Sequence, residues 1–263
     1  MRALVTGAAG AFGRAVAAAL RDRGWTVMTT DIHGDVDVLA DVADDSCVEL
    51  LRAATGDTLD ALVYCAGVGL PSDVGMPPTA AVRQTLEVNL LGAWRATGAA
   101  MPALLASRGR VVLVASGLAF VPLPFAGAYA VSKRALSAYA DQLRAEYGSH
   151  LSVTTVYPGY VATAIHDAGT AAGLSFEGQI YAESVADVVQ KIVSVIEARR
   201  APRDVGSTWR TTAGLWAGRH APRTVDRLVA LRLRQLVRRG DFDAAPVAAG
   251  LRHRLGGRSA GRS

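Results

Sequence analysis

The 263-residue sequence predicts an α/β fold in which helices cover both faces of a doubly wound parallel sheet. Apolar segments of strand length alternate with amphipathic segments of helix length along most of the chain. Several strand segments, such as Val-Val-Leu-Val at residues 111–114, are apolar without alternation, which is typical of parallel strands buried on both faces. Repeated strand–helix–strand units with right-handed crossovers give three layers and place a ligand site beyond the carboxyl ends of the strands. We therefore expect a Rossmann-type single domain, since α/β domains of this length are often undivided.

The individual elements are placed by their period and by the residues that begin and end them. Strands are expected at residues 2–5, 26–30, 61–65, 110–115 and 152–157, with a short extra strand at 36–40. Helices are expected at residues 11–23, 45–55, 79–107, 128–147 and 184–198. Pro102 is expected to divide the third helix into two pieces. No clear apolar strand is visible after residue 200.

Composition favours a soluble enzyme. Hydrophobic residues make up 51% of the chain and charged residues 19%, without the run of about twenty apolar residues that a membrane span needs. The chain enters an apolar strand almost at once, which leaves no room for a cleaved leader, so a cytoplasmic protein is expected. Cys47 and Cys65 lack metal-ligand spacing and fit buried thiols in a reducing compartment, and no metal site is predicted.

The carboxyl-terminal part of the chain is strongly basic. Residues 199–263 contain fifteen Arg and four Asp, a net charge of +11, whereas residues 1–198 carry −6. Within this part, residues 223–239 form a helical apolar stripe flanked by arginines. The stripe consists of Val225, Leu228, Val229, Leu233 and Leu236.

This basic helix is expected to pack on its own domain or on a partner subunit, in preference to an anionic membrane surface. Nucleic-acid binding is not expected, because no binding motif is present and few aromatic residues lie among the arginines. The predicted organisation is a main domain at residues 1–200, a helical extension at 201–250 and a disordered tail at 251–263.

A glycine-rich turn joins the first predicted strand to the first predicted helix. The segment Thr-Gly-Ala-Ala-Gly-Ala-Phe-Gly occupies residues 6–13 and contributes Gly7, Gly10, Phe12 and Gly13. Such a turn lets the backbone approach a pyrophosphate, and the helix N-terminus then offers N–H donors and a favourable dipole. Glycines alone are weak support, because any tight strand-to-helix turn could use them.

Asp31 strengthens the interpretation of this turn as a dinucleotide site. It ends the second strand, eighteen residues after Gly13, where a carboxylate accepts hydrogen bonds from the adenosine ribose hydroxyls. The carboxylate would also repel a 2′-phosphate, and neither Arg nor Lys lies beside it in Thr-Asp-Ile-His. The expected cofactor is therefore NAD in preference to NADP, contacted by Asp31 and Ile32. The alternative is that Asp31 is a turn or cap residue after the strand.

Tyr129 and Lys133 are candidates for acid–base chemistry. They lie four residues apart at the start of a long predicted helix, so their side chains share one face. A phenol titrates near pH ~10, and a neighbouring ammonium favours the phenolate, so the pKa of Tyr129 is expected to be lowered towards the useful range. In isolation this spacing is common and usually marks an exposed helix face.

Together these features resemble the short-chain dehydrogenase/reductase family over residues 1–200. In that family a serine lies thirteen residues before the tyrosine, and Ser116 has this position; Asn89, in Glu-Val-Asn-Leu-Leu-Gly, resembles the family's asparagine. The resemblance implies a hydride-transferring oxidoreductase in which Ser116 orients the substrate oxygen and Tyr129 exchanges its proton. It also implies that Lys133 lowers the pKa of the phenol and that Asn89 holds a water linking Lys133 to solvent. Taken singly, Ser116 fits a strand end and Asn89 a buried helix residue equally well.

The resemblance also implies further cofactor contacts and an oligomer. These contacts are Asp41 and Val42 at adenine, Ala66 and Gly67 beside the adenine-side ribose, and Pro158, Gly159, Val161 and Thr163 along the nicotinamide. A homodimer or homotetramer is expected through the helices around residues 85–105 and 128–147.

Two features depart from the pattern of the shorter family members. Ala11 replaces a central glycine, and the resulting glycine spacing resembles the longer, sugar-nucleotide-modifying members, although the chain is short for their extra substrate domain. Tyr64 and Cys65 replace an Asn-Asn pair, which removes polar anchors from the fourth strand.

The substrate side of the site is predicted to be apolar. Residues 164–183 correspond to the family's lid, and loops of this length are usually functional. The apolar residues that follow Ser116 are Leu118, Phe120, Val121, Leu123 and Phe125. We expect a hydrophobic secondary alcohol or ketone as substrate. The alternatives are a non-catalytic dinucleotide-sensing or scaffold protein and an epimerase or dehydratase that recycles its hydride.

Overall fold

The computed structural model describes residues 1–174 and 181–255 and contains one seven-stranded parallel sheet. The strand order is β3-β2-β1-β4-β5-β6-β7, and every pairing is parallel. The strands are β1 (Arg2–Thr6), β2 (Thr26–Asp31), β3 (Val38–Leu39), β4 (Ala61–Tyr64), β5 (Arg110–Val114), β6 (Ser152–Tyr157) and β7 (Asp204–Gly206). The order reverses between β1 and β4, so a crevice opens at the carboxyl ends of these strands. The predicted single-domain Rossmann-type fold is confirmed.

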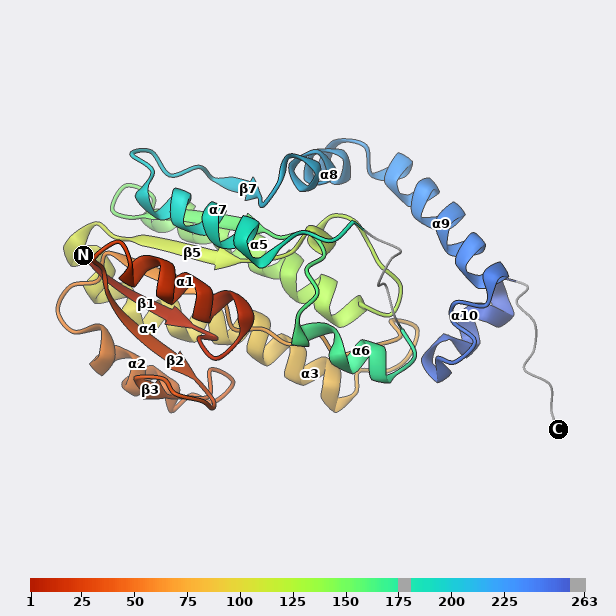
Figure 1. Cartoon of the computed structure of the whole chain (residues 1–263), viewed down its shortest axis with the longest axis horizontal. Coiled ribbons are helices and arrows are strands. Elements are labelled where there is room, and N and C mark those ends of the chain that lie inside the picture. Colours follow the sequence, from red (N-terminus) through yellow and green to blue (C-terminus); the bar gives the residue numbers. More distant parts are fainter. Residues whose placement is uncertain (175–180, 256–263) are drawn as a thin grey trace.

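Helices cover both faces of this sheet. They are α1 (Ala11–Arg21), α2 (Cys47–Thr55), α3 (Ala80–Leu86), α4 (Gly92–Ser107), α5 (Gly127–Tyr147), α6 (Asp167–Ala171), α7 (Val185–Glu197), α8 (Trp209–His220), α9 (Pro222–Arg239) and α10 (Ala249–Arg254). Figure 1 shows α1 and α7 on one face and α4 and α5 on the other. Each pair belongs to its own buried apolar cluster, so two cores enclose the sheet in three layers. Within the described residues, none of the helices is both long and apolar enough to cross a bilayer.

The predicted break at Pro102 is wrong. Pro102 lies inside α4, whose inner face of small residues is buried against the sheet, and this packing tolerates the loss of one helical hydrogen bond. The interruption comes earlier, at a π-helical segment, Glu87–Leu91, between α3 and α4. The wider π turn carries Asn89, and such turns occur frequently at functional sites.

The region after residue 200 contains a strand and a helix that the sequence did not indicate. Strand β7 has only three residues, two of them half-buried, so it has no apolar run. Its pairing with β6 at Thr155, Val156 and Tyr157 defines it. Helix α8 follows directly, and Thr208 caps it by accepting a hydrogen bond from the Thr211 N–H.

Among the described residues, helix α9 of the basic extension has buried side chains only in its last turns. Leu236 and Val237 in the last turns of α9 are buried in a small cluster with Phe125 and Leu174 from the main domain. Helix α10 continues to Arg254, past the predicted start of the tail. The rest of the predicted tail, residues 256–263, lies outside the described residues.

Candidate active site

A cavity of about 670 Å³ opens at the carboxyl ends of β1, β4, β5 and β6. Its wall is formed by the glycine turn, the loops that follow these strands, the start of α5 and part of α8. Of the predicted site residues, the wall contains Gly7, Gly10, Phe12, Gly13, Gly67, Ser116, Tyr129, Lys133, Pro158, Gly159, Val161 and Thr163. The others, Asp31, Ile32, Asp41, Val42, Ala66 and Asn89, lie outside it.

The turn after β1 requires glycine at two positions. Gly7 has φ +66°, and a Cβ there would lie 2.6 Å from the Ala66 nitrogen. A Cβ on Gly13 would lie 2.2 Å from the Gly7 carbonyl oxygen. Gly10 is the N-cap of α1 and provides no side-chain acceptor for the first N–H groups of that helix. The N-terminus of α1 therefore reaches the cavity without a side-chain cap or an acidic residue in its first turn.

Asp31 lies beside this turn, outside the cavity wall. Its carboxylate accepts hydrogen bonds from the Ala9 N–H (2.9 Å) and the Ile32 N–H (2.7 Å) and lies 3.2 Å from His33 Nδ1. A carboxylate has about four acceptor positions, so these contacts leave it capacity for a further donor. Further along the chain, the Asp41 carboxylate accepts from the Ala43 N–H.

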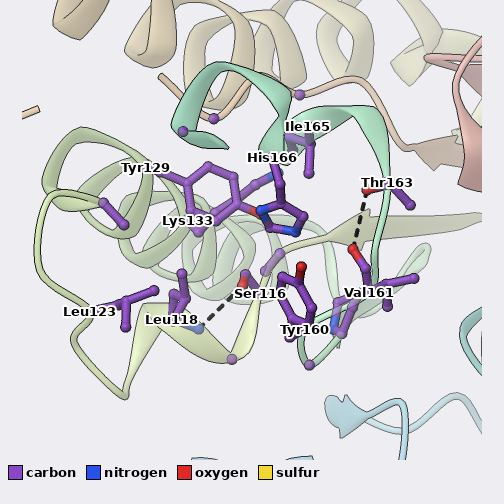
Figure 2. Close-up of a pocket in the computed structure, with 18 of the residues that line it drawn as sticks. Ser116, Leu118, Leu123, Tyr129, Lys133, Tyr160, Val161, Thr163, Ile165 and His166 are labelled. Carbon is purple, nitrogen blue, oxygen red and sulfur yellow. Dashed lines mark hydrogen bonds between the residues drawn. The ribbon is translucent and has the colours of Figure 1, made fainter. Parts of the chain in front are cut away.

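Ser116, Tyr129 and Lys133 are brought together, as Figure 2 shows. Ser116 lies two residues after the end of β5, and its Oγ accepts a hydrogen bond from the Leu118 N–H (3.2 Å). Lys133 Nζ donates to the Val114 carbonyl (2.9 Å) and lies 5.7 Å from the centre of the Tyr129 ring. The i, i+4 spacing on α5 thus places the phenol and the ammonium side by side at the end of β5.

The pKa values of this pair differ from the sequence-based expectation. Burial raises the pKa of Tyr129 to about 12, with the Ser116 hydroxyl acting in the opposite direction. Burial also lowers the pKa of Lys133 to about 8, because the low-dielectric site disfavours its charge. The expected lowering of the phenol's pKa by Lys133 is therefore not observed, since desolvation dominates at both groups. Tyr129 is protonated at neutral pH in this state.

Asn89 is fully buried and joins the loop after β4 to α5. Its Oδ1 accepts from the Val68 N–H (2.8 Å), and its Nδ2 donates to the Val68 carbonyl (3.0 Å) and to Ser132 Oγ (2.9 Å). A Cβ on Gly67 would lie 3.3 Å from both Asn89 Oδ1 and Lys133 Nζ. Asn89 therefore keeps the loop after β4 close to Lys133.

A family model described as short chain dehydrogenase matches residues 1–172. The chain belongs to this family. It is 34% identical over 213 residues to 1-deoxy-11-beta-hydroxypentalenate dehydrogenase of Streptomyces exfoliatus, a match that covers 71% of this chain and 77% of that protein. It is 32% identical over 179 residues to 3-amino-tetrahydro-pyrrolizinone reductase of Xenorhabdus hominickii, covering 62% of this chain and 63% of the relative.

Several relatives are longer than the region they share with this chain. The match covers 52% of 11-beta-hydroxysteroid dehydrogenase-like 6 of Arabidopsis thaliana. Among solved structures, a short chain dehydrogenase from Burkholderia cenocepacia in complex with NADP superposes with a TM-score of 0.74 at 23% identity, covering 87% of this chain and 96% of that one. At this identity the likeness shows the fold.

Tyr64 and Cys65, at the end of β4, stand at the two positions where the shorter family members have an Asn-Asn pair. The fully buried Tyr64 hydroxyl donates to the Val88 carbonyl (2.6 Å), at the π-helical segment. Cys65 lines the cavity, and burial raises the pKa of its thiol to about 12, with Lys133 acting in the opposite direction. The phenol of Tyr64 therefore links the end of β4 to the π-helical segment, and Cys65 is held as a neutral thiol.

This short-chain dehydrogenase also has a buried carboxylate that sequence reasoning missed. Glu183 accepts hydrogen bonds from the Gly159 N–H (2.9 Å), Thr208 Oγ1 (2.6 Å), Ser207 Oγ and Thr211 Oγ1. Burial raises its pKa, but these four donors together outweigh burial and lower it. No local pattern could reveal this cluster, because its hydroxyl donors come from the unpredicted β7–α8 region.

The rest of the cavity wall is largely apolar, with a few polar side chains. The apolar side chains include Leu118, Val121, Leu123, Phe125, Ile165 and Leu174. Among its polar residues, His166 packs against Tyr160 with ring centres 4.8 Å apart, and the Arg210 guanidinium lies 4.2 Å from the centre of the Tyr181 ring. Burial lowers the pKa of His166, which favours its neutral form. Within the described residues, no group of three or more His, Cys, Asp or Glu side chains could hold a metal ion.

Proposed function

We propose that this short-chain dehydrogenase transfers a hydride between NAD(H) and a hydrophobic secondary alcohol or ketone, with Tyr129 as the general acid and base. The observation that carries the proposal is the meeting of Tyr129, Ser116 and Lys133 at the wall of an apolar cavity that also reaches the uncapped N-terminus of α1. The family supports an oxidoreductase, and the apolar wall supports a substrate without phosphate groups.

The residues present fit a nicotinamide dinucleotide. Glycines at positions 7 and 13 let the backbone fold tightly, and the N-terminus of α1, with Gly10, Phe12 and Gly13 in the cavity wall, would offer N–H groups to a pyrophosphate. Asp31 and Ile32 would contact the adenosine ribose. The remaining proposed cofactor contacts are Asp41, Val42, Ala66, Gly67, Tyr129, Lys133, Pro158, Gly159, Val161 and Thr163.

When bound, the cofactor supplies or accepts the hydride. In the reduction direction, the protonated Tyr129 phenol donates its proton to the carbonyl oxygen that Ser116 Oγ orients. Lys133 would hold the nicotinamide ribose, while Asn89 positions the loop after β4 beside Lys133. In the oxidation direction Tyr129 must first lose its proton, so the oxidation rate is expected to rise with pH, whereas the reduction rate is not limited by phenol ionisation near neutrality.

Asp31 supports NAD in preference to NADP. A second negative charge near its carboxylate would cost about 1–2 kcal/mol, on the order of tenfold in affinity. Replacing Asp31 with Ser is expected to shrink the preference for NADH over NADPH by about this factor.

A homodimer or homotetramer through α4 and α5 is part of the proposal. Trp94 on α4 is 56% exposed and stacks on Tyr139 of α5, and Val131 on α5 is 57% exposed. Apolar side chains left exposed on two adjacent helices favour burial against a second copy. A cytoplasmic location is proposed with it.

The test is turnover of a panel of apolar ketones and alcohols, with phosphorylated sugars for comparison, using NADH and NADPH in parallel. We expect turnover of apolar compounds with NADH preferred. Activity confined to charged sugars would overturn the substrate class. NADH binding without turnover of any compound would indicate a sensor, and product formation without net change in NADH absorbance would indicate an epimerase or dehydratase.

A further inference from the structure

Helices α8 and α9 expose large apolar side chains. Leu228 and Leu231 on α9 are 61% and 56% exposed, and Trp209 and Trp216 on α8 are 75% and 64% exposed. The buried contacts of α9 with the domain are made near its end, at Leu236 and Val237, by a different side of the helix. Figure 1 shows α9 at the outer edge of the molecule, away from the sheet. Helix α9 therefore exposes apolar side chains that its packing on the domain does not cover.

Arginines border this exposed stripe on both sides. At about 100° per residue, Leu228 and Leu231 lie about 60° apart on the helix surface. Arg223, Arg227, Arg234 and Arg238 follow one edge of the stripe, and Arg232 and Arg239 follow the other. Helix α9 contains these six Arg and a single Asp, a net charge of +5. Among residues 1–174 and 181–255, none of the six forms an ion pair.

We propose that the exposed side of α9, with Leu228, Leu231 and its six arginines, docks on the surface of an anionic lipid bilayer, and that Trp209 and Trp216 of α8 take part in this contact. An apolar stripe between rows of Arg is the pattern of a helix that lies in the plane of the headgroups, with its apolar side chains among the acyl chains. Indole rings favour the same interfacial depth, because one end is apolar and the other polar.

Charge decides between this occupant and two others. A second copy of the same face would bring two helices of net charge +5 together, which like-charge repulsion disfavours. A nucleic acid would match the arginines but offers no apolar surface to Leu228 and Leu231. A bilayer with anionic headgroups satisfies both the charge and the apolar stripe.

Docking in this way would bring the substrate cavity close to the bilayer. Helix α8 contributes Thr211, Gly214 and Leu215 to the cavity wall and exposes Trp209 and Trp216 on its other side. Apolar compounds that dissolve in the bilayer would thus be concentrated near the cavity. The lipid contact itself does not depend on the proposed catalytic function.

The test is co-sedimentation of the full chain with vesicles of phosphatidylcholine alone or with about a third phosphatidylserine. We expect binding to the anionic vesicles, and its release in about 0.5 M NaCl. The double variant Arg227→Gln/Arg234→Gln should weaken binding about 25-fold, since each Arg near the surface contributes about fivefold. Its matched control, Arg52→Gln/Arg83→Gln on α2 and α3, removes the same charge and should bind like the unmodified chain.

A second variant tests the apolar part of the face. Leu228→Asn/Leu231→Asn keeps every charge and should weaken vesicle binding at least about tenfold, with the oligomeric state unchanged by light scattering. Three results would overturn the proposal: no binding to anionic vesicles, equal loss in the α9 variant and its matched control, or a change of oligomeric state in the leucine variant. Tight binding to duplex DNA with no vesicle binding would likewise reject the bilayer as the partner.

Discussion

Replacing Lys133 with Met is expected to stabilise the folded chain at neutral pH while it abolishes turnover. Lys133 is 3% exposed, and burial lowers its pKa from 10.5 to about 8. The charged form is therefore disfavoured in the folded state relative to the unfolded chain. A methionine of similar length fills the same space without a charge.

The magnitude follows from these two pKa values. The difference corresponds to about 3 kcal/mol of destabilisation, fully present below pH 8, decreasing as the pH rises towards 10.5 and absent above it. Methionine also leaves the Val114 carbonyl without its donor, which costs about 1 kcal/mol. The net gain in free energy of unfolding is thus about 2 kcal/mol at pH 7, and it should reverse to a loss of about 1 kcal/mol near pH 10.5.

Urea unfolding at pH 7 and near pH 10.5 measures this crossover. The matched control is Lys191→Met on α7, since Lys191 is the chain's other lysine and is half-buried. The control should show no reversal between the two pH values. A Lys133→Met chain that is less stable at pH 7, or a gain that does not depend on pH, would refute the electrostatic reasoning.

Three further substitutions test other parts of the site. Gly13→Ala should abolish NADH binding in calorimetry, because its Cβ would lie 2.2 Å from the Gly7 carbonyl oxygen. In the control Gly10→Ala the Cβ would lie 3.2 Å from the same atom, so binding should weaken by no more than about tenfold. Equal effects of the two substitutions would contradict the geometry. Asn89→Ala should lower the free energy of unfolding by about 3 kcal/mol in urea, since it removes the three hydrogen bonds of a fully buried side chain; a loss below about 1 kcal/mol would count against that network. Glu183→Gln should destabilise the chain at pH 7 but not in strong acid, because a carboxylate with a lowered pKa stabilises the fold above its unfolded pKa and loses this effect as the pH falls through its folded pKa; a pH-independent difference in Tm would disprove the role of the charge.

The fold and the centre of the site could be predicted because their signals are local. The glycine turn, the uninterrupted apolar strands and the spacing of Tyr129 and Lys133 each lie within a few residues of sequence. The predicted and observed bounds of the first six strands therefore agree within a few residues. Ser116 is predicted only through the resemblance to the family, in which a serine lies thirteen residues before the tyrosine.

The remaining features depend on contacts between distant segments. Asn89, in the π-helical segment, makes hydrogen bonds to Val68 and Ser132, which are distant in sequence. The prediction used only the local signal of Pro102 and therefore placed the helix break wrongly. Strand β7 is defined by its pairing with β6, and the hydroxyl donors to Glu183 come from the residues that follow this strand and from α8. The pKa values likewise depend on burial, which spacing along the chain does not determine.

The measurement that tests the central proposal most directly is turnover by Tyr129→Phe beside Tyr139→Phe, a matched control on the same helix. Tyr139 is also buried but stacks on Trp94 away from the cavity. We expect the Tyr129 variant to bind NADH normally and to lose on the order of a thousandfold in kcat, with the control close to the unmodified chain. A Tyr129→Phe chain that retains its turnover would show that another group moves the proton.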